Sequence, residues 1–161
     1  EQFPEKGWDK VMDLNLKSPF FLTQALYEQL KAGGASGSPA KVINITSIDG
    51  QRLNPWETWS YHASKAGLIH LTKRLAARLV SDNIVVTSLA PGAFASDMNR
   101  AARDHADEVG KGIPLGRIGN AEDLAGAAIF LASRAGDYVV GATLTVDGGL
   151  VNAELGNSID V

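Results

Sequence analysis

The stretch NIVVTSLAPG, residues 83–92, decides the fold that this sequence predicts. From Asn83 to Ala90 it is a nearly continuous apolar run with several β-branched side chains, and Pro91-Gly92 ends the run. A run of this kind is typical of a strand that is buried on both faces, as in a parallel sheet covered by helices. We therefore place this strand inside the predicted sheet.

Helical and strand patterns alternate on both sides of this stretch. Apolar residues recur at three- and four-residue spacing in the longer segments, and Asn120 is a candidate N-cap because acidic residues follow it. The sequence predicts helices over 5–31, 60–80, 97–109 and 120–136, and strands over 41–47, 83–90 and 142–149. This order predicts an α/β fold with a parallel sheet and helices on both of its faces.

Composition narrows the classes of function. The chain is 45% hydrophobic and 20% charged, as globular domains are, and its net charge of −3 gives no reason to expect a nucleic acid or an anionic membrane as partner. The absence of cysteine excludes disulfides, thiol catalysis and cysteine-bound zinc, and it fits a cytoplasmic protein. The longest apolar stretch, 124–132, is far shorter than the about 20 residues that span a membrane. We predict no metal site and no membrane partner.

Ligands of parallel α/β sheets bind beyond the carboxyl ends of the strands. Ser47 lies at the end of strand 41–47, and Pro91 and Gly92 lie at the end of strand 83–90. The Ser47 hydroxyl could bind a substrate carbonyl, and Gly92 could let a flat ring approach the backbone. The alternatives are a serine that caps local backbone and simple turn chemistry.

Tyr61 and Lys65 are four residues apart and share one face of helix 60–80. A nearby ammonium favours the phenolate, so Lys65 is expected to lower the pKa of Tyr61 and fit it for proton transfer. A surface tyrosine beside an extended lysine is the alternative, and the spacing alone would favour it because it arises readily by chance.

Six segments together resemble the short-chain dehydrogenase/reductase family. They are DLNLKSPFF, KVINITSIDG, YHASK, APGAFASDM, IPLGRIGNAEDLAGAAIFLAS and VVGATLTVDGG, which come in the family's order and span nearly all of residues 8–149. The resemblance implies that residues 1–149 are the C-terminal part of a doubly wound Rossmann-type domain, followed by a tail over 150–161.

The resemblance also implies a catalytic set of Asn15, Ser47, Tyr61 and Lys65. In it Tyr61 is the general acid/base, Ser47 orients the carbonyl, and Lys65 lowers the Tyr61 pKa and holds the nicotinamide ribose. Cofactor contacts are implied for Tyr61, Lys65, Pro91, Gly92, Phe94 and Ser96. The implied reaction is hydride transfer between NADP(H), with NAD(H) as the second choice, and a carbonyl or alcohol carbon.

The C-terminal segments most resemble the 3-oxoacyl-[acyl-carrier-protein] reductase branch, so the expected substrate is a small carbonyl compound or alcohol, including an acyl thioester. Trp56, Trp59 and helix 97–109 are expected to shape its pocket. Four cations near this helix could meet an acidic carrier protein, but four acidic residues in the same segment favour a solvated mixed-charge surface. The cations are Arg100, Arg103, Lys111 and Arg117, and the acidic residues are Asp97, Asp104, Asp107 and Glu108.

The sequence contains no Gly-rich dinucleotide fingerprint, which in the family precedes the segments matched here. We therefore expect the chain to begin part-way through a longer protein, or to need a partner surface, because strand 41–47 would otherwise leave an open sheet edge. The resemblance implies a homo-oligomer built on helices 5–31 and 60–80. A truncated, catalytically incompetent protein that acts through self-association is the alternative function.

Pro19 lies inside the apolar pattern of helix 5–31, four residues after Asn15. A proline has no N–H to donate to the carbonyl four residues back, so the Asn15 carbonyl loses its helical partner. In the family this carbonyl holds a water of a proton relay. We expect Pro19 to kink the helix near Asn15 and keep that carbonyl open.

Overall fold

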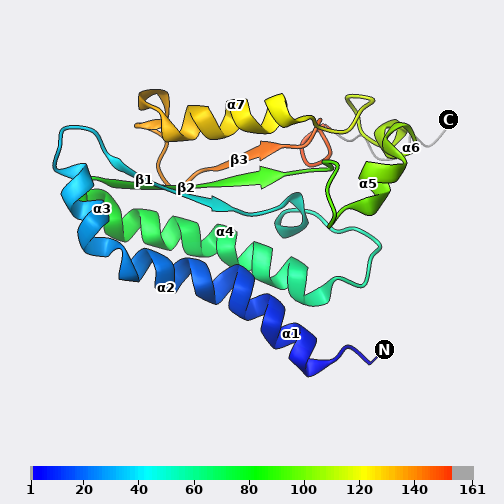
Figure 1. Cartoon of the computed structure of the whole chain (residues 1–161), viewed down its shortest axis with the longest axis horizontal. Helices are drawn as coiled ribbons and strands as arrows, with labels where there is room; N and C mark the ends of the chain where they lie inside the picture. The colour runs from blue at the N-terminus through cyan, green and yellow to red at the C-terminus, as the bar shows by residue number, and fades with distance from the viewer. Residues whose placement is uncertain (1, 154–161) are drawn as a thin grey trace, which may run out of the picture.

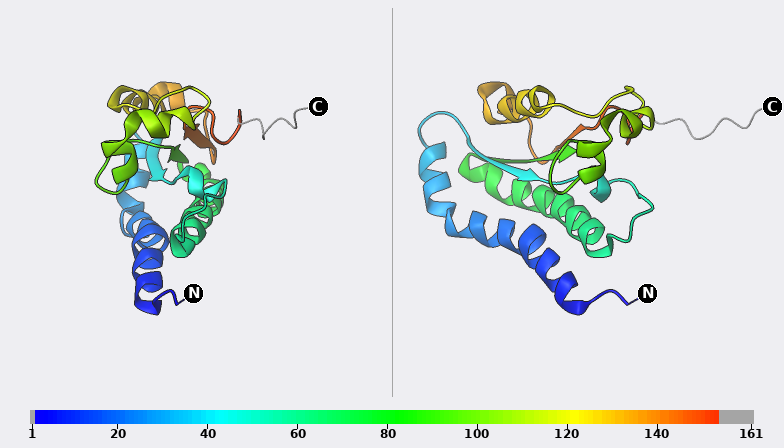
Figure 2. Two further views of the ribbon diagram at one scale, coloured as in Figure 1. Left: turned by 90° about the vertical axis from the view of Figure 1, so that its right-hand side faces the viewer. Right: turned by 45° about the vertical axis from the view of Figure 1, so that its right-hand side comes forward.

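The computed structural model describes residues 2–153 and confirms the α/β fold. Three parallel strands form one sheet in the order β1-β2-β3, with β1 at Ala40–Ile45, β2 at Ile84–Pro91 and β3 at Thr143–Val146. Helix α7 (Ala121–Ala132) covers one face of the sheet, and α4 (Trp59–Leu79) covers the other (Figure 1). Helices α1 (Glu5–Met12), α2 (Ser18–Ala25) and α3 (Tyr27–Gly34) lie beside α4 on that second face (Figure 2).

The predicted central strand is the most deeply buried element of the sheet. Every residue of β2 from Ile84 to Ala90 is buried, and β2 pairs with β1 on one side and β3 on the other. Ile84 and Val86 pack with Ala76 and Leu79 of α4, while the alternate side chains of β2 face the other layer. Burial on both faces explains why the run in the sequence is continuous rather than alternating.

The long N-terminal helix predicted over 5–31 is wrong in detail. It is divided into α1, a π-helical turn at Asp13–Lys17, α2 and α3, with a second interruption at Leu26. The backbone N–H and the hydroxyl of Ser18 both donate to the Asp13 carbonyl, five residues back. The distortion therefore surrounds Asn15 and ends two residues before Pro19, as expected of a proline that disturbs the helical ladder. The availability of the Asn15 carbonyl stays a prediction.

The helix predicted over 97–109 is also divided. It forms α5 (Arg100–Asp104) and α6 (Ala106–Lys111), and His105 between them has a non-helical backbone with φ of −136°. Both short helices lie near the carboxyl ends of the strands (Figure 1). Helices 60–80 and 120–136 are confirmed as α4 and α7, and Asn120 caps α7 in a reciprocal capping box with Asp123.

Strand β1 is an edge of the sheet among the described residues. The backbone N–H groups of Ala40 and Thr46 donate to the Asn83 and Leu89 carbonyls on the β2 side. Because the backbone groups of successive strand residues point in opposite directions, those of Lys41, Ile43 and Ile45 point to the open side. A groove of about 510 Å³ runs along this edge between β1 and α2–α3, and most of its lining is apolar. The open edge expected from the sequence is therefore present.

The predicted tail over 150–161 falls mostly outside the described residues. Leu150, the first residue of this tail, is hydrogen-bonded to the loop after β1, because an Arg52 guanidinium N–H donates to its carbonyl at 2.8 Å. None of the helices within residues 2–153 has the length and apolar character that a membrane crossing requires.

Candidate active site

The first turns of α4 meet the carboxyl end of β1, and this junction brings three predicted site residues together. Tyr61 and Lys65 lie on successive turns of α4, and Ser47 is the second residue after β1. The Lys65 ammonium lies 5.5 Å from the centre of the Tyr61 ring and donates to the Ile45 carbonyl at 2.9 Å. Lys65 is only 9% exposed, so the pair is not the surface tyrosine and extended lysine of the alternative interpretation.

Ser47 has both the local role and the position expected of it. Its side chain accepts a hydrogen bond from the Asp49 backbone N–H at 3.1 Å and so caps the 3₁₀ turn Ile48–Gly50. The Ser47 hydroxyl also interacts with the Tyr61 phenol, which lowers the pKa of that phenol. The capping bond leaves the Ser47 O–H free to donate, because a hydroxyl that accepts one bond can still donate another.

Asn15 reaches the same junction from the π-helical turn. Its side-chain amide donates to the Ser64 hydroxyl at 3.2 Å, and Ser64 donates in turn to the Tyr61 carbonyl at 2.8 Å. Ser64 is fully buried between the helices. No pattern in the sequence distinguishes this serine, although it directly precedes Lys65. The extra residue in the π-helical turn re-aims the side chains of this segment, and such turns recur at functional sites.

The pKa of Tyr61 differs from the expectation. Partial burial raises it above the ordinary value, the Ser47 hydroxyl opposes that rise, and the negative charge of Asp49 adds to it. Burial also lowers the pKa of Lys65. Burial and Asp49, rather than Lys65, set the direction of the Tyr61 pKa shift, and the Lys65 ammonium donates to the Ile45 carbonyl.

The four residues predicted beside the nicotinamide lie at the end of β2 and in the loop after it. A Cβ on Gly92 would come within 2.7 Å of the Asp147 backbone, so the neighbouring strand end alone requires glycine there. Phe94 bridges to Gly119, whose missing side chain leaves room for the Phe94 ring, and Ser96 accepts from the Asn99 N–H. Pro91 ends β2 opposite Val146. Their cofactor contacts stay predictions.

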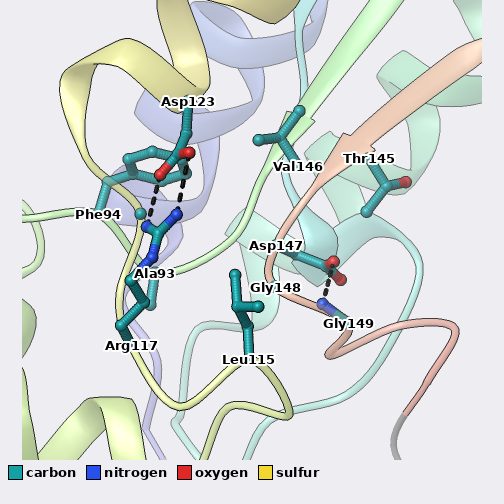
Figure 3. A pocket seen from close by; sticks show the side chains of 11 residues that line it. Ala93, Phe94, Leu115, Arg117, Asp123, Thr145, Val146, Asp147, Gly148 and Gly149 are labelled. Carbon is teal, nitrogen blue, oxygen red and sulfur yellow. Dashed lines mark hydrogen bonds and ion pairs between the residues drawn. The ribbon is translucent and has the colours of Figure 1, made fainter.

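A pocket of about 360 Å³ opens at the ends of β2 and β3 (Figure 3). Phe94 and Leu115 contribute apolar walls, and Arg117 binds Asp123 through two N–H···O contacts of 2.6 and 3.1 Å. Hydrogen bonding to Arg117 holds the pKa of Asp123 at about 2. This pocket could not be predicted from the sequence, because its walls come from four separate segments.

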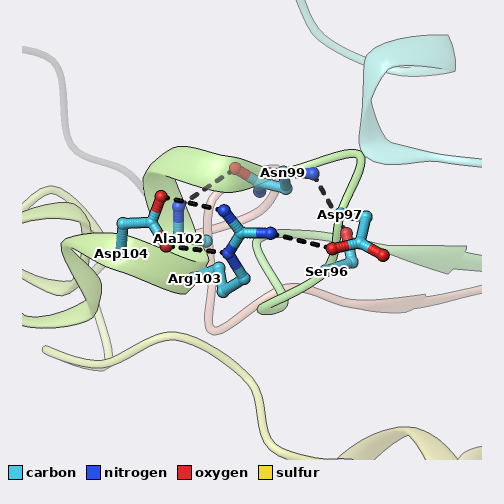
Figure 4. A network of polar contacts seen from close by, with 6 residues as sticks. All are labelled: Ser96, Asp97, Asn99, Ala102, Arg103 and Asp104. Atoms are coloured by element: carbon cyan, nitrogen blue, oxygen red, sulfur yellow. Dashed lines mark hydrogen bonds and ion pairs between the residues drawn. The ribbon is translucent and has the colours of Figure 1, made fainter.

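The cations near α5 and α6 favour the mixed-charge interpretation. Arg103 binds Asp97 at 2.8 Å and Asp104 at 2.7 Å, and Asn99 caps α5 beside them (Figure 4). All three charged side chains are largely exposed. With Arg117 also engaged, two of the four candidate cations are neutralised within the chain.

The site fits the nicotinamide end of a dinucleotide. A buried ammonium and a phenol face the carboxyl edge of parallel strands, where such ligands bind. Lys65 and Tyr61 could hold ribose hydroxyls and a substrate oxygen with the donors that they present. Within residues 2–153 no cluster of three or more His, Asp or Glu side chains could hold a metal ion.

The chain is similar to a known protein family and to several curated proteins. The family model described as "Enoyl-(Acyl carrier protein) reductase" matches residues 1–151. A 2-dehydro-3-deoxy-D-gluconate 5-dehydrogenase of Dickeya dadantii is 41% identical over 151 residues, which are 92% of this chain and 58% of that protein. A rhamnolipids biosynthesis 3-oxoacyl-[acyl-carrier-protein] reductase of Pseudomonas aeruginosa is 41% identical over 154 residues, with 92% and 59% covered.

Solved structures are also similar to this chain. The Pseudomonas aeruginosa RhlG/NADP active-site complex superposes with a TM-score of 0.87 at 39% identity, covering 92% of this chain and 59% of that one. The chain thus spans about 58% of the length of the curated relatives that it matches. The order of the matched segments, the parallel sheet and the family model lead to one conclusion: the chain belongs to the short-chain dehydrogenase/reductase family.

Proposed function

We propose that this chain provides the proton-transfer site of an oxidoreductase that interconverts a carbonyl and an alcohol with NADP(H), or secondarily NAD(H). The observation that carries the proposal is the convergence of Asn15, Ser47, Tyr61 and Lys65 at the carboxyl end of β1. The structural neighbour bound to NADP supports the choice of cofactor. When bound, the cofactor supplies or accepts the hydride.

The residues of this chain would handle the substrate oxygen and its proton. In reduction, Ser47 donates a hydrogen bond to the carbonyl oxygen, and Tyr61 transfers its phenolic proton to that oxygen as the carbon gains the hydride. The Tyr61 phenol is protonated near neutral pH, and burial raises its pKa further, so it starts the reduction as a proton donor. Lys65 places an ammonium beside the Tyr61 ring, where it could hold the ribose hydroxyls of the cofactor.

For the substrate we propose a small ketone, either a 3-oxoacyl thioester or a hydroxylated keto acid. The two relatives named above are a 3-oxoacyl-carrier reductase and a sugar-acid dehydrogenase at equal identity, so identity does not separate the two classes. The pairing of Arg103 and Arg117 with carboxylates argues against a strongly basic surface for an acidic carrier.

We also propose that the protein acts as a homo-oligomer in the cytoplasm. Exposed apolar side chains on the N-terminal helices, most of them lining the groove beside β1, support self-association, since monomers rarely expose such clusters. They are Leu14, Phe21, Leu22 and Leu26, with exposures between 43% and 66%. The lack of cysteine supports the reducing compartment.

A second candidate function is self-association without catalysis. The open β1 edge and the apolar groove beside it favour this candidate, because unpaired strand edges invite pairing with another chain.

Cofactor titration separates the two candidates. We expect the protein to enhance and blue-shift nicotinamide fluorescence when NADPH is added, with weaker binding of NADH. Lys65→Met should weaken this binding, because it removes the buried ammonium, whereas the exposed Lys6→Met should leave it unchanged. Saturable self-association with no response at high micromolar NADPH or NADH would favour the second candidate.

A further inference from the structure

Asp49 lies beside the catalytic set and has no role in the proposed reaction. It is the middle residue of the 3₁₀ turn Ile48–Gly50 that follows Ser47. Its backbone N–H donates to the Ser47 hydroxyl oxygen at 3.1 Å. Asp49 is partly buried, so its carboxylate is neither fully solvated nor enclosed.

Gly50 docks this turn directly on α4. A Cβ at Gly50 would lie 2.7 Å from the Lys65 carbonyl carbon and 2.9 Å from the Ala66 nitrogen, both backbone atoms. Only glycine allows the turn to approach the helix so closely. The approach occurs one helical turn from Tyr61, so Asp49 is fixed next to the Tyr61–Lys65 face.

Asn54 fixes the carboxylate itself. The Asn54 amide donates to Asp49 Oδ1 at 3.0 Å, and the amide oxygen of Asn54 accepts from the Trp56 backbone N–H at 2.8 Å. The second contact holds the Asn54 amide in the orientation that presents its NH₂ group to Asp49. The negative charge of Asp49 therefore has a defined position rather than a mobile one.

We propose that Asp49 is a positioning residue for Tyr61, and that its fixed carboxylate keeps the Tyr61 phenol in the protonated, proton-donating form. A negative charge held near a phenol disfavours the phenolate, so the fixed carboxylate would move the loss of the Tyr61 proton to higher pH. The catalytic meaning rests on the proposed function, whereas the effect on Tyr61 belongs to the chain alone.

Among the groups around Tyr61, Asp49 is the anion whose charge raises the pKa of the phenol. From α4, the cation is Lys65, bound to Ile45, and the adjacent His62 ring turns its Nδ1 to Thr58. From the π-helical turn, the residue bound to this part of α4 is the uncharged Asn15. Asp49 is the one charged side chain that contributes to the raised pKa of Tyr61 among the described residues.

Tyrosine titration by NMR tests the proposal without any cofactor. The chain has three tyrosines, so ring labelling with ¹³C gives three signals, and Tyr61→Phe identifies the one from Tyr61. Because the pKa of Tyr61 is raised, the titration runs from about pH 7 to about pH 12, with circular dichroism checking the fold at each pH. In Asp49→Asn, we expect the Tyr61 ionisation constant to rise by about tenfold, the effect of one neighbouring charge.

Two further variants keep the test decisive. Asn54→Ala frees the carboxylate and should shift Tyr61 in the same direction by a smaller factor, while Asp107→Asn, on the exposed surface of α6, should leave it unchanged. An unchanged or raised Tyr61 midpoint in Asp49→Asn would overturn the proposal. If that variant does not fold, an unchanged midpoint in Asn54→Ala would overturn it. If Asp49→Asn lowers the Tyr61 midpoint but the parent protein does not bind NADPH, the proposed function is refuted and the role of Asp49 is supported.

Discussion

Tyr61→Phe is expected to lower the turnover of carbonyl reduction by about 10²–10⁴-fold, the usual contribution of a positioned general acid. Phenylalanine keeps the ring that lies against the Lys65 ammonium and removes only the hydroxyl that interacts with Ser47. The substrate oxygen would then have to take its proton from water. Turnover is measured from the loss of NADPH absorbance with saturating ketone.

The loss should appear in turnover rather than in cofactor affinity, since Lys65 keeps its place. Tyr138→Phe is the matched control, because the Tyr138 side chain is 99% exposed and lies on the segment after α7. Turnover within about threefold of the parent in Tyr61→Phe would contradict the assigned role, since a general acid contributes far more than that.

Gly50→Ala is expected to lower the free energy of unfolding by about 1–3 kcal/mol, the usual cost of forcing extra atoms into a packed contact. The added Cβ would meet the Lys65 and Ala66 backbone and the Ile69 side chain, all within 2.9 Å. Because backbone atoms of a helix cannot move aside singly, the turn Ile48–Gly50 should shift away from α4. Urea denaturation followed by circular dichroism measures the change.

The same substitution should disturb the site, because Ser47 and Asp49 travel with the turn. Gly126→Ala provides the control: Gly126 lies within α7, and a Cβ at this position would meet no atom within 4 Å beyond its own stretch of helix. Alanine there should stabilise that helix by about 0.5–1 kcal/mol. Equal stability of Gly50→Ala and the parent protein would show that the turn does not rest on α4.

The elements that carry their own local signal could be predicted from the sequence. The apolar run of β2 predicted a buried parallel strand, and Asn120 with Asp123 predicted the start of α7. Tyr61 and Lys65 could be placed on one face because helical spacing fixes that relation regardless of the rest of the fold.

The remaining features depend on contacts between distant segments. Gly92 could be interpreted as leaving room for a ring, whereas Asp147, which follows β3, is what occupies that space. Ser64 links Asn15 to α4 across 49 residues of sequence, and Asn54 acts on Asp49 only through the shape of its loop. No periodicity or propensity reports such contacts, so these residues could not be chosen from the sequence.

The direction of the Tyr61 pKa shift could not be predicted from the sequence either. The four-residue spacing predicted the proximity of Lys65, and that proximity is present. The spacing could not predict that burial would raise the Tyr61 pKa or that the Lys65 ammonium would donate to the Ile45 carbonyl. The sign of a pKa shift is a sum of opposing effects, and burial is known only when the fold is known.

Hydride transfer itself is the most direct test of the central claim. The protein is incubated with NADPH that carries deuterium at both nicotinamide C4 positions, together with a 3-oxoacyl thioester or a hydroxylated keto acid. We predict an alcohol with deuterium on the former carbonyl carbon, formed in equal amount with NADP⁺, and loss of this product in Tyr61→Phe. Bound NADPH that transfers no deuterium to either substrate class, or equal transfer by Tyr61→Phe, would contradict this claim.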